Sequence, residues 1–150
     1  MSNRRLMTVA SSFVGLALAA SAVLAASPIE DRQAAMKAIG KATGELAKIA
    51  KKETKFDAAT VKANAEIIHD KLGVAKALFP EGSGPAQGIK TRALPEIWTD
   101  HATFEAALNR AEEASLAMLQ VTSESDFKPA LGTLGGACKN CHDKFRKPEE

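Results

Sequence analysis

The chain has 150 residues, with 20 Lys or Arg against 18 Asp or Glu, so its formal net charge at pH 7 is +2 with neutral histidines. This near balance lacks the clustered basic excess that nucleic-acid-binding surfaces need, and we expect no nucleic-acid partner. Aromatic residues are few, no run of alternating β-branched residues predicts a sheet, and the length allows one domain.

The first 25 residues have the features of a secretory signal peptide. Arg4 and Arg5 give a positive start, and an uncharged stretch rich in Ala, Leu, Val and Ser covers residues 6–29. Small residues suit cleavage just after Ala25. We therefore predict that this segment is cleaved, that residues 26–150 form the mature domain, and that the protein is periplasmic. The uncharged stretch is also just long enough to span a bilayer, so an uncleaved membrane anchor is the alternative.

Two helices are predicted in the first half of the mature chain. The first begins at Ser27, with Pro28 at its first position and Glu30 completing a capping box. The second follows Asp57, which suits an N-cap, and ends at Pro80. Each contains an inward stripe with alternating steps of three and four residues, which is one face of a helix. The two stripes are Arg32, Met36, Ile39, Thr43, Leu46 and Ala50, and Val61, Ala65, Ile68, Leu72, Ala75 and Phe79.

Two more helices are predicted after a loop rich in Gly and Pro. The third begins with a short turn at Pro95 and continues as a main helix capped by Thr99 or Asp100; the fourth begins near Ser125, with Pro129 in its first turn. Their stripes are Phe104, Leu108, Ala111, Ser115 and Met118, and Phe127, Leu131, Leu134, Cys138, Cys141 and Phe145. Four helices of about 20 residues, each with one apolar seam, predict an all-α antiparallel four-helix bundle.

The only two cysteines, Cys138 and Cys141, stand in the sequence Cys-Lys-Asn-Cys-His, with His142 directly after the second. This spacing matches the attachment motif of c-type haem, because positions three apart share a helix face and let both thiols reach one porphyrin. A thioredoxin-like pair would open a helix in an α/β fold. A structural zinc site needs four ligands, and only His69 and His101 remain to add. We therefore predict one covalently attached haem c per chain, with His142 on the iron.

The second axial position of the iron has several candidates. Met36 and Met118 both lie in inward stripes, where a methionine more often fills the core than binds a metal. His69 is expected to face solvent, and His101 to serve a helix start. The residue pattern leaves the two methionines equal as candidates.

The chain resembles the cytochrome c-prime family over about residues 28–147. "RQAAMKAIG" is similar to the family's first-helix motif, "LPEIWTDHATFEAA" to its segment entering the third helix, and "CKNCHDKFR" to its closing motif. High-spin members have an apolar haem-facing residue in the first motif and bind small gases on five-coordinate iron. In low-spin members of the cytochrome c-556 type, a methionine there binds the iron. Met36 stands at that position, so the resemblance implies the low-spin branch, with His142 and Met36 as axial ligands.

The resemblance implies roles for further residues. Arg32 would lie near one haem propionate with Gln33 as a weaker contact, and Arg146 would either pair with the other propionate or face water. Phe79 and Trp98 would wall the haem pocket. Family members often form dimers through their first two helices, which implies a homodimer here.

An iron bound by both His142 and Met36 has no open position, which suits one-electron transfer. We therefore expect a periplasmic monohaem electron carrier that docks transiently on a redox donor and acceptor. We expect no enzyme, because no nucleophile–base pair or carboxylate pair stands out. The alternative is a five-coordinate high-spin protein that binds nitric oxide or carbon monoxide, which requires Met36 off the iron. A membrane partner is expected only if residues 1–25 are retained.

Overall fold

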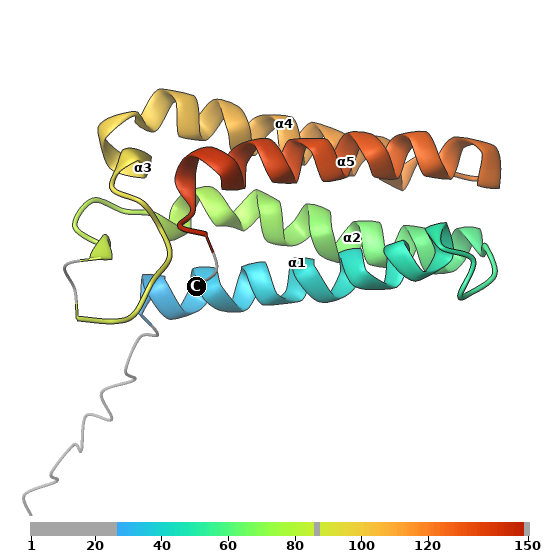
Figure 1. Cartoon of the computed structure of the whole chain (residues 1–150), viewed down its shortest axis with the longest axis horizontal. Helices are drawn as coiled ribbons and strands as arrows, with labels where there is room; N and C mark the ends of the chain where they lie inside the picture. Colours follow the sequence, from blue (N-terminus) through green and yellow to red (C-terminus); the bar gives the residue numbers. More distant parts are fainter. Residues whose placement is uncertain (1–26, 86–87, 149–150) are drawn as a thin grey trace, which may run out of the picture.

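Four long helices run antiparallel in up-down-up-down order in the computed structural model, which describes residues 27–85 and 88–148 (Figure 1). They are α1 (Pro28–Ala50), α2 (Ala58–Ala75), α4 (His101–Leu119) and α5 (Glu124–Phe145). A 3₁₀ turn, η1 (Lys76–Leu78), extends α2, and the short α3 (Glu96–Thr99) precedes α4. The two described ranges contain no strand, only one isolated bridge between Ala93 and Arg146. The predicted all-α four-helix bundle is confirmed.

The predicted signal peptide, residues 1–25, lies outside the described residues. Within the ranges that the structure covers, no helix combines the length and the apolar character needed to cross a bilayer.

The starts of α1 and α2 follow the predicted capping residues. The Ser27 hydroxyl accepts a hydrogen bond from the Ile29 N–H at 3.3 Å, and the Glu30 carboxylate accepts one from the Ser27 N–H at 3.4 Å. At α2, the Asp57 carboxylate accepts from the Thr60 N–H at 2.8 Å and also from the Thr60 hydroxyl. These bonds to the charged form lower the pKa of Asp57. Both caps satisfy N–H groups that a helix start leaves without partners.

The start of α5 lies within one residue of its prediction, but Pro129 does not lie in the first turn. The helix begins at Glu124, because the Ser123 hydroxyl accepts from the Asp126 N–H at 3.3 Å and so acts as the N-cap. Pro129 therefore lies in the second turn instead of the first. Proline has no N–H, so the Ser125 carbonyl lacks its usual partner four residues later.

How completely the residues of each predicted stripe are buried depends on how many helices pack against that helix. Every stripe residue of α2 and α4 is buried, because α2 packs on α1 and α4, and α4 packs on α2 and α5. In contrast, α1 and α5 make few direct contacts with each other. Parts of their stripes therefore remain only half-buried, and these include Met36 on α1 and Cys138 and Cys141 on α5. The open side of the bundle thus coincides with the predicted site.

A cluster of aromatic side chains fills the end of the bundle where α1 begins and α5 ends. Phe104 is central: its ring centroid lies 4.8 Å from that of Phe79 and 5.3 Å from that of Phe145, both edge to face. Ile97 and Leu108 complete a buried apolar layer with these rings. This layer lines one side of the cavity that the predicted site residues surround.

Truncating the core of the bundle gives a large loss of stability. Leu46 on α1 is fully buried in the main cluster, to which α1, α2, α4 and α5 all contribute, and we expect Leu46→Ala to lower the free energy of unfolding by about 2–5 kcal/mol. Leu116 on α4 is 45% exposed, so Leu116→Ala is the matched control, with a change within about 0.5 kcal/mol. Urea unfolding of both variants measures the difference. Equal losses in the two variants would contradict the assignment of the core.

Candidate functional site

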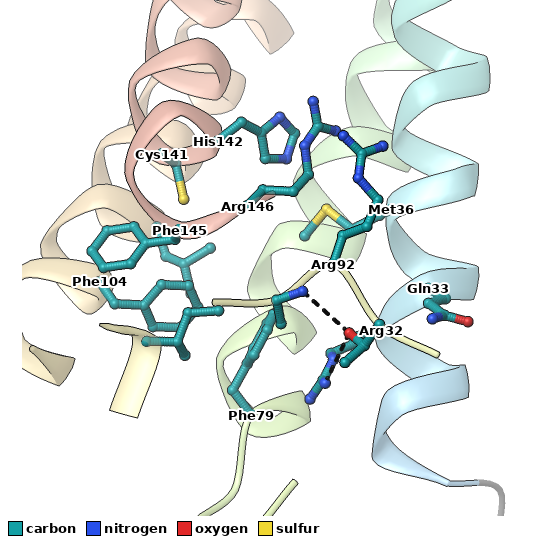
Figure 2. A pocket seen from close by; sticks show the side chains of 14 residues that line it. Arg32, Gln33, Met36, Phe79, Arg92, Phe104, Cys141, His142, Phe145 and Arg146 are labelled. Carbon is teal, nitrogen blue, oxygen red and sulfur yellow. Dashed lines mark hydrogen bonds between the residues drawn. The ribbon is translucent and has the colours of Figure 1, made fainter. Parts of the chain in front are cut away.

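A cavity of about 350 Å³ opens between α1 and α5 at the aromatic end of the bundle (Figure 2). Its volume is in the range of small-molecule and cofactor sites. The cavity is lined by Arg32, Gln33, Met36, Phe79, Thr91, Arg92, Ala93, Ile97, Phe104, Leu108, Cys141, His142, Phe145 and Arg146. Five of the six predicted site residues are therefore in the lining. The sixth, Cys138, lies one turn before Cys141 and is packed against the main core cluster.

The two cysteines lie on the same side of α5 and are both half-buried free thiols. Burial raises the pKa of Cys138, and burial together with the neighbouring Cys138 raises the pKa of Cys141 to about 11. Unmodified thiols with raised pKa values are protonated at neutral pH. This is the opposite of the lowered pKa that a thioredoxin-like pair requires. The described ranges also contain no group of three or more His, Cys, Asp or Glu side chains that could hold a metal ion.

His142 is held in the form that binds metals. Its ring is half-buried at the cavity, and this burial lowers its pKa. The positive charges of Arg146 and Arg92 lower the pKa further, against a smaller opposing effect of Asp143. The imidazole is therefore neutral at pH 7, which leaves a nitrogen lone pair for a metal.

The structure separates the four candidates for the second axial ligand. Met36 lies across the cavity from His142, with α1 supplying one and α5 the other (Figure 2). Met118 is fully buried in the main core cluster and does not line the cavity. His101 is exposed at the start of α4, as predicted. His69 is half-buried instead of solvated, and its Nδ1 lies 3.1 Å from the Ser115 hydroxyl.

The contact between His69 and Ser115 does not form a catalytic pair. Ser115 has no exposed surface, and its hydroxyl donates to the Glu112 carbonyl at 2.6 Å. His69 must then donate from Nδ1 to the Ser115 oxygen, so it cannot accept the serine proton there. The pair joins α2 to α4 and has no access to substrate.

Arg32 is a buried cation at the wall of the cavity. Its guanidinium donates to the Ser83 carbonyl at 2.8 Å, the Ser83 hydroxyl at 3.1 Å and the Thr91 hydroxyl at 3.3 Å. It also lies over the Phe79 ring, 4.9 Å from the centroid. Burial lowers its pKa. None of these partners is an acidic side chain, so the charge of Arg32 is available to an anion in the cavity.

Two residues of the lining carry functional groups that sequence reasoning missed. Arg92 lines the cavity, and its Nε and Nη2 donate to the Lys147 carbonyl at 3.0 and 2.7 Å. Thr91 lines it beside Arg92. Both lie in the irregular segment between η1 and α3, where no periodic pattern marks an inward position. Conversely, Trp98 does not line the cavity: its indole N–H donates to the Pro80 carbonyl, and its ring packs on Gly84.

The residues around the cavity fit a haem. An imidazole and a thioether face it from opposite helices, and the two thiols lie on one face of α5. Arg32, Arg92 and Arg146 line the cavity with no acidic residue in the lining, which suits the two negative propionates of a haem. Apart from the polar Gln33 and Thr91, the remaining walls are apolar and aromatic, as a porphyrin face requires.

Comparisons with known proteins also indicate a haem-binding protein. The family model described as Cytochrome C' matches residues 27–146. Cytochrome c' of Rhodopseudomonas palustris is 37% identical, with 95% of each chain covered, and cytochrome c-556 of Agrobacterium fabrum is 36% identical, with 95% of this chain and 96% of that protein covered. A solved structure of cytochrome c' from Rhodopseudomonas palustris superimposes with a TM-score of 0.78 at 35% identity, over 84% of this chain and 100% of that one. The chain therefore belongs to the cytochrome c' family, whose members carry one covalently attached haem c per chain.

Proposed function

We propose that the protein is a periplasmic one-electron carrier with a low-spin haem c bound by His142 and Met36. The single observation that carries this proposal is the position of Met36, whose side chain faces the cavity from the side opposite His142. Haem supplies the exchange of one electron between ferric and ferrous iron. The other parts of the proposal concern what the side chains of this chain do.

Each site residue has one role. Cys138 and Cys141 would hold the macrocycle through thioether links from one face of α5, and the neutral imidazole of His142 would bind the iron. The Met36 sulfur would be the second protein ligand of the iron and, as a soft thioether, would favour the ferrous state. Arg32 and Arg146 neutralise the propionates, with Arg32 already held in place by Ser83 and Thr91.

Two protein ligands, His142 and Met36, would favour electron transfer over the binding of gases. With both in place, the bound haem would supply one-electron exchange with little movement of these side chains, so little reorganisation would oppose the transfer. The buried aromatic layer of Phe79, Phe104 and Phe145 beneath the cavity keeps water from that side of the site.

The expected partners are proteins that dock weakly and briefly, as redox encounters do. Lys139, Lys144 and Lys147 are exposed on and just after the last turns of α5, so an acidic partner face is favoured. We expect the rate of electron exchange with such a partner to fall with rising ionic strength, and a rate independent of salt would contradict this. Location in the periplasm rests on the predicted signal peptide.

A homodimer through the first two helices is supported by the outer face of α2. Ile67 and Val74 lie seven residues apart on this face and are 44% and 52% exposed. Covering them in a second copy would bury apolar surface that a monomer leaves in water. Sedimentation at micromolar concentration tests this, and a monomer would contradict it.

The second candidate function is binding of small gases by five-coordinate iron. The relative from Rhodopseudomonas palustris carries the name cytochrome c', and this name favours the high-spin branch. The relative from Agrobacterium fabrum, at nearly equal identity, carries the name cytochrome c-556. The two candidates differ in one feature, namely whether Met36 is on the iron.

The visible spectrum of the exported, haem-loaded protein distinguishes the two candidates. It is recorded oxidised and reduced, with and without carbon monoxide. A sharp low-spin ferrous spectrum that carbon monoxide changes only slowly, and only at high concentration, is the result we expect. A broad high-spin spectrum that shifts with carbon monoxide would overturn the carrier and support the gas-binding protein.

A further inference from the structure

The two helices that face each other across the cavity are joined by a segment from a third part of the chain. α1 carries Met36 and α5 carries His142, yet α1 and α5 make few direct contacts. Residues 90–94, which we name the strap, lie between them and contribute Thr91, Arg92 and Ala93 to the lining of the cavity.

The strap is attached to α5 mainly through its backbone. The Leu94 N–H donates to the Phe145 carbonyl at 3.0 Å, and the Lys147 N–H donates to the Arg92 carbonyl at 2.8 Å. The Arg92 side chain adds two bonds to the Lys147 carbonyl. Because backbone groups make the first two bonds, side-chain substitutions leave them in place. The strap therefore moves with the end of α5 that carries His142.

The attachment of the strap to α1 rests on side chains. The Arg32 guanidinium donates to the Thr91 hydroxyl at 3.3 Å, and the Gln33 side-chain amide donates to the Lys90 carbonyl at 2.8 Å (Figure 2 shows the first). The Thr91 oxygen also accepts from the Ala93 N–H at 3.2 Å, which fixes the hydroxyl within the strap. Arg32 and Gln33 precede Met36 by four and three residues, so both lie one helical turn from it.

We propose that Thr91 and Gln33 are positioning residues, which tie α1 to the strap and so determine how firmly the Met36 sulfur is held toward the iron. This inference rests on the proposed function, because it requires Met36 as the sixth ligand. With both ties in place, the first turns of α1 keep their distance from α5. With the ties removed, that distance is set by the packing of α1 on α2 and η1, by its few contacts with α5 and by the bonds of Arg32 to Ser83, and Met36 leaves the iron more often.

The test is the rate at which carbon monoxide binds to the reduced, haem-loaded protein, since carbon monoxide must wait for the Met36 sulfur to leave. We compare the wild type with Thr91→Val, Gln33→Leu and the double variant. Each lost hydrogen bond weakens the tie modestly, so we expect rates about threefold higher in each single variant and about tenfold higher in the double variant. Thr91→Ser keeps the hydroxyl and should restore the wild-type rate.

Thr43→Val is the matched control, because it removes a hydroxyl of α1 that donates to the Ile39 carbonyl and does not line the cavity. It should leave the carbon monoxide rate unchanged, even if its unfolding temperature falls as much as that of Thr91→Val. Rates that follow the unfolding temperature across all variants would overturn the proposal.

The wild-type measurement separates failure of this inference from failure of the proposed function. A wild type that binds carbon monoxide at once, without a slow step, would overturn the carrier and the role of the strap together. A slow wild type with an equally slow double variant would overturn the role of the strap alone.

Discussion

Met36→Leu will turn the reduced protein from one that resists carbon monoxide into one that binds it. Leucine has nearly the volume of methionine but no sulfur, so the walls of the cavity stay in place while one ligand of the iron is lost. We expect the apparent dissociation constant for carbon monoxide to fall on the order of a hundredfold, the effect of an iron–sulfur bond worth about 2.7 kcal/mol. The measurement is a carbon monoxide titration followed by the visible spectrum. The reduction potential should fall in the same variant, because thioether ligation favours the ferrous state.

The matched control for this change is Met118→Leu. Met118 is fully buried in the main core cluster and does not line the cavity, so the same chemical change there should leave the spectrum intact. Its cost should be limited to less than about 1.5 kcal/mol of stability. If Met36→Leu and the wild type have the same spectrum and the same response to carbon monoxide, Met36 is only part of the packing.

Replacing both Cys138 and Cys141 with alanine will abolish covalent attachment of haem. These are the only cysteines of the chain, so no other thiol can substitute. Cys138 lies one turn before His142 on α5, and Cys141 lies directly beside it. No other residue of α5 brings a sulfur to this end of the helix. The measurement is haem staining of the protein after denaturing electrophoresis, where only covalently held haem remains.

The single variants are the controls for the double one. Cys138→Ala and Cys141→Ala each leave one thiol, so each should retain a stained band when haem is attached at all. Cys141 lines the cavity directly, whereas Cys138 packs on the main core cluster, and both substitutions are of half-buried residues. A stained band of wild-type strength in the double variant would contradict the assignment of the attachment site.

Much of the bundle could be predicted because its determinants are local. The capping box at Ser27 and the N-cap at Asp57 each need only residues within one turn, and both are present as predicted. The inward stripes of α2 and α4 are fully buried because each of these helices has two long neighbours. The start of α5 at Glu124 lies one residue from the predicted start near Ser125, and the bond from the Asp126 N–H identifies Ser123 as its N-cap.

The site could be predicted in part for the same reason. The spacing of Cys138, Cys141 and His142 is local and sufficient to indicate haem attachment. The residue pattern alone left Met36 and Met118 equal, and the resemblance to the cytochrome c-prime family favoured Met36. The packing of the helices supplies the physical difference, since only Met36 reaches the cavity.

The contribution of the segment before α3 had no local signal at all. Thr91 receives its bond from a residue 59 positions away, and Arg92 pairs with one 55 positions away. Contacts of this kind depend on the tertiary fold, and neither periodicity nor composition marks them in advance.

The central claim is that the iron is bound by His142 and Met36 together. X-ray absorption at the iron edge of the reduced, haem-loaded protein tests it most directly, because this measurement reports the elements bound to the metal. The account predicts six ligands, one of them a sulfur that is absent from Met36→Leu. Five ligands, all of them nitrogen, would contradict it and would leave the iron open to small gases.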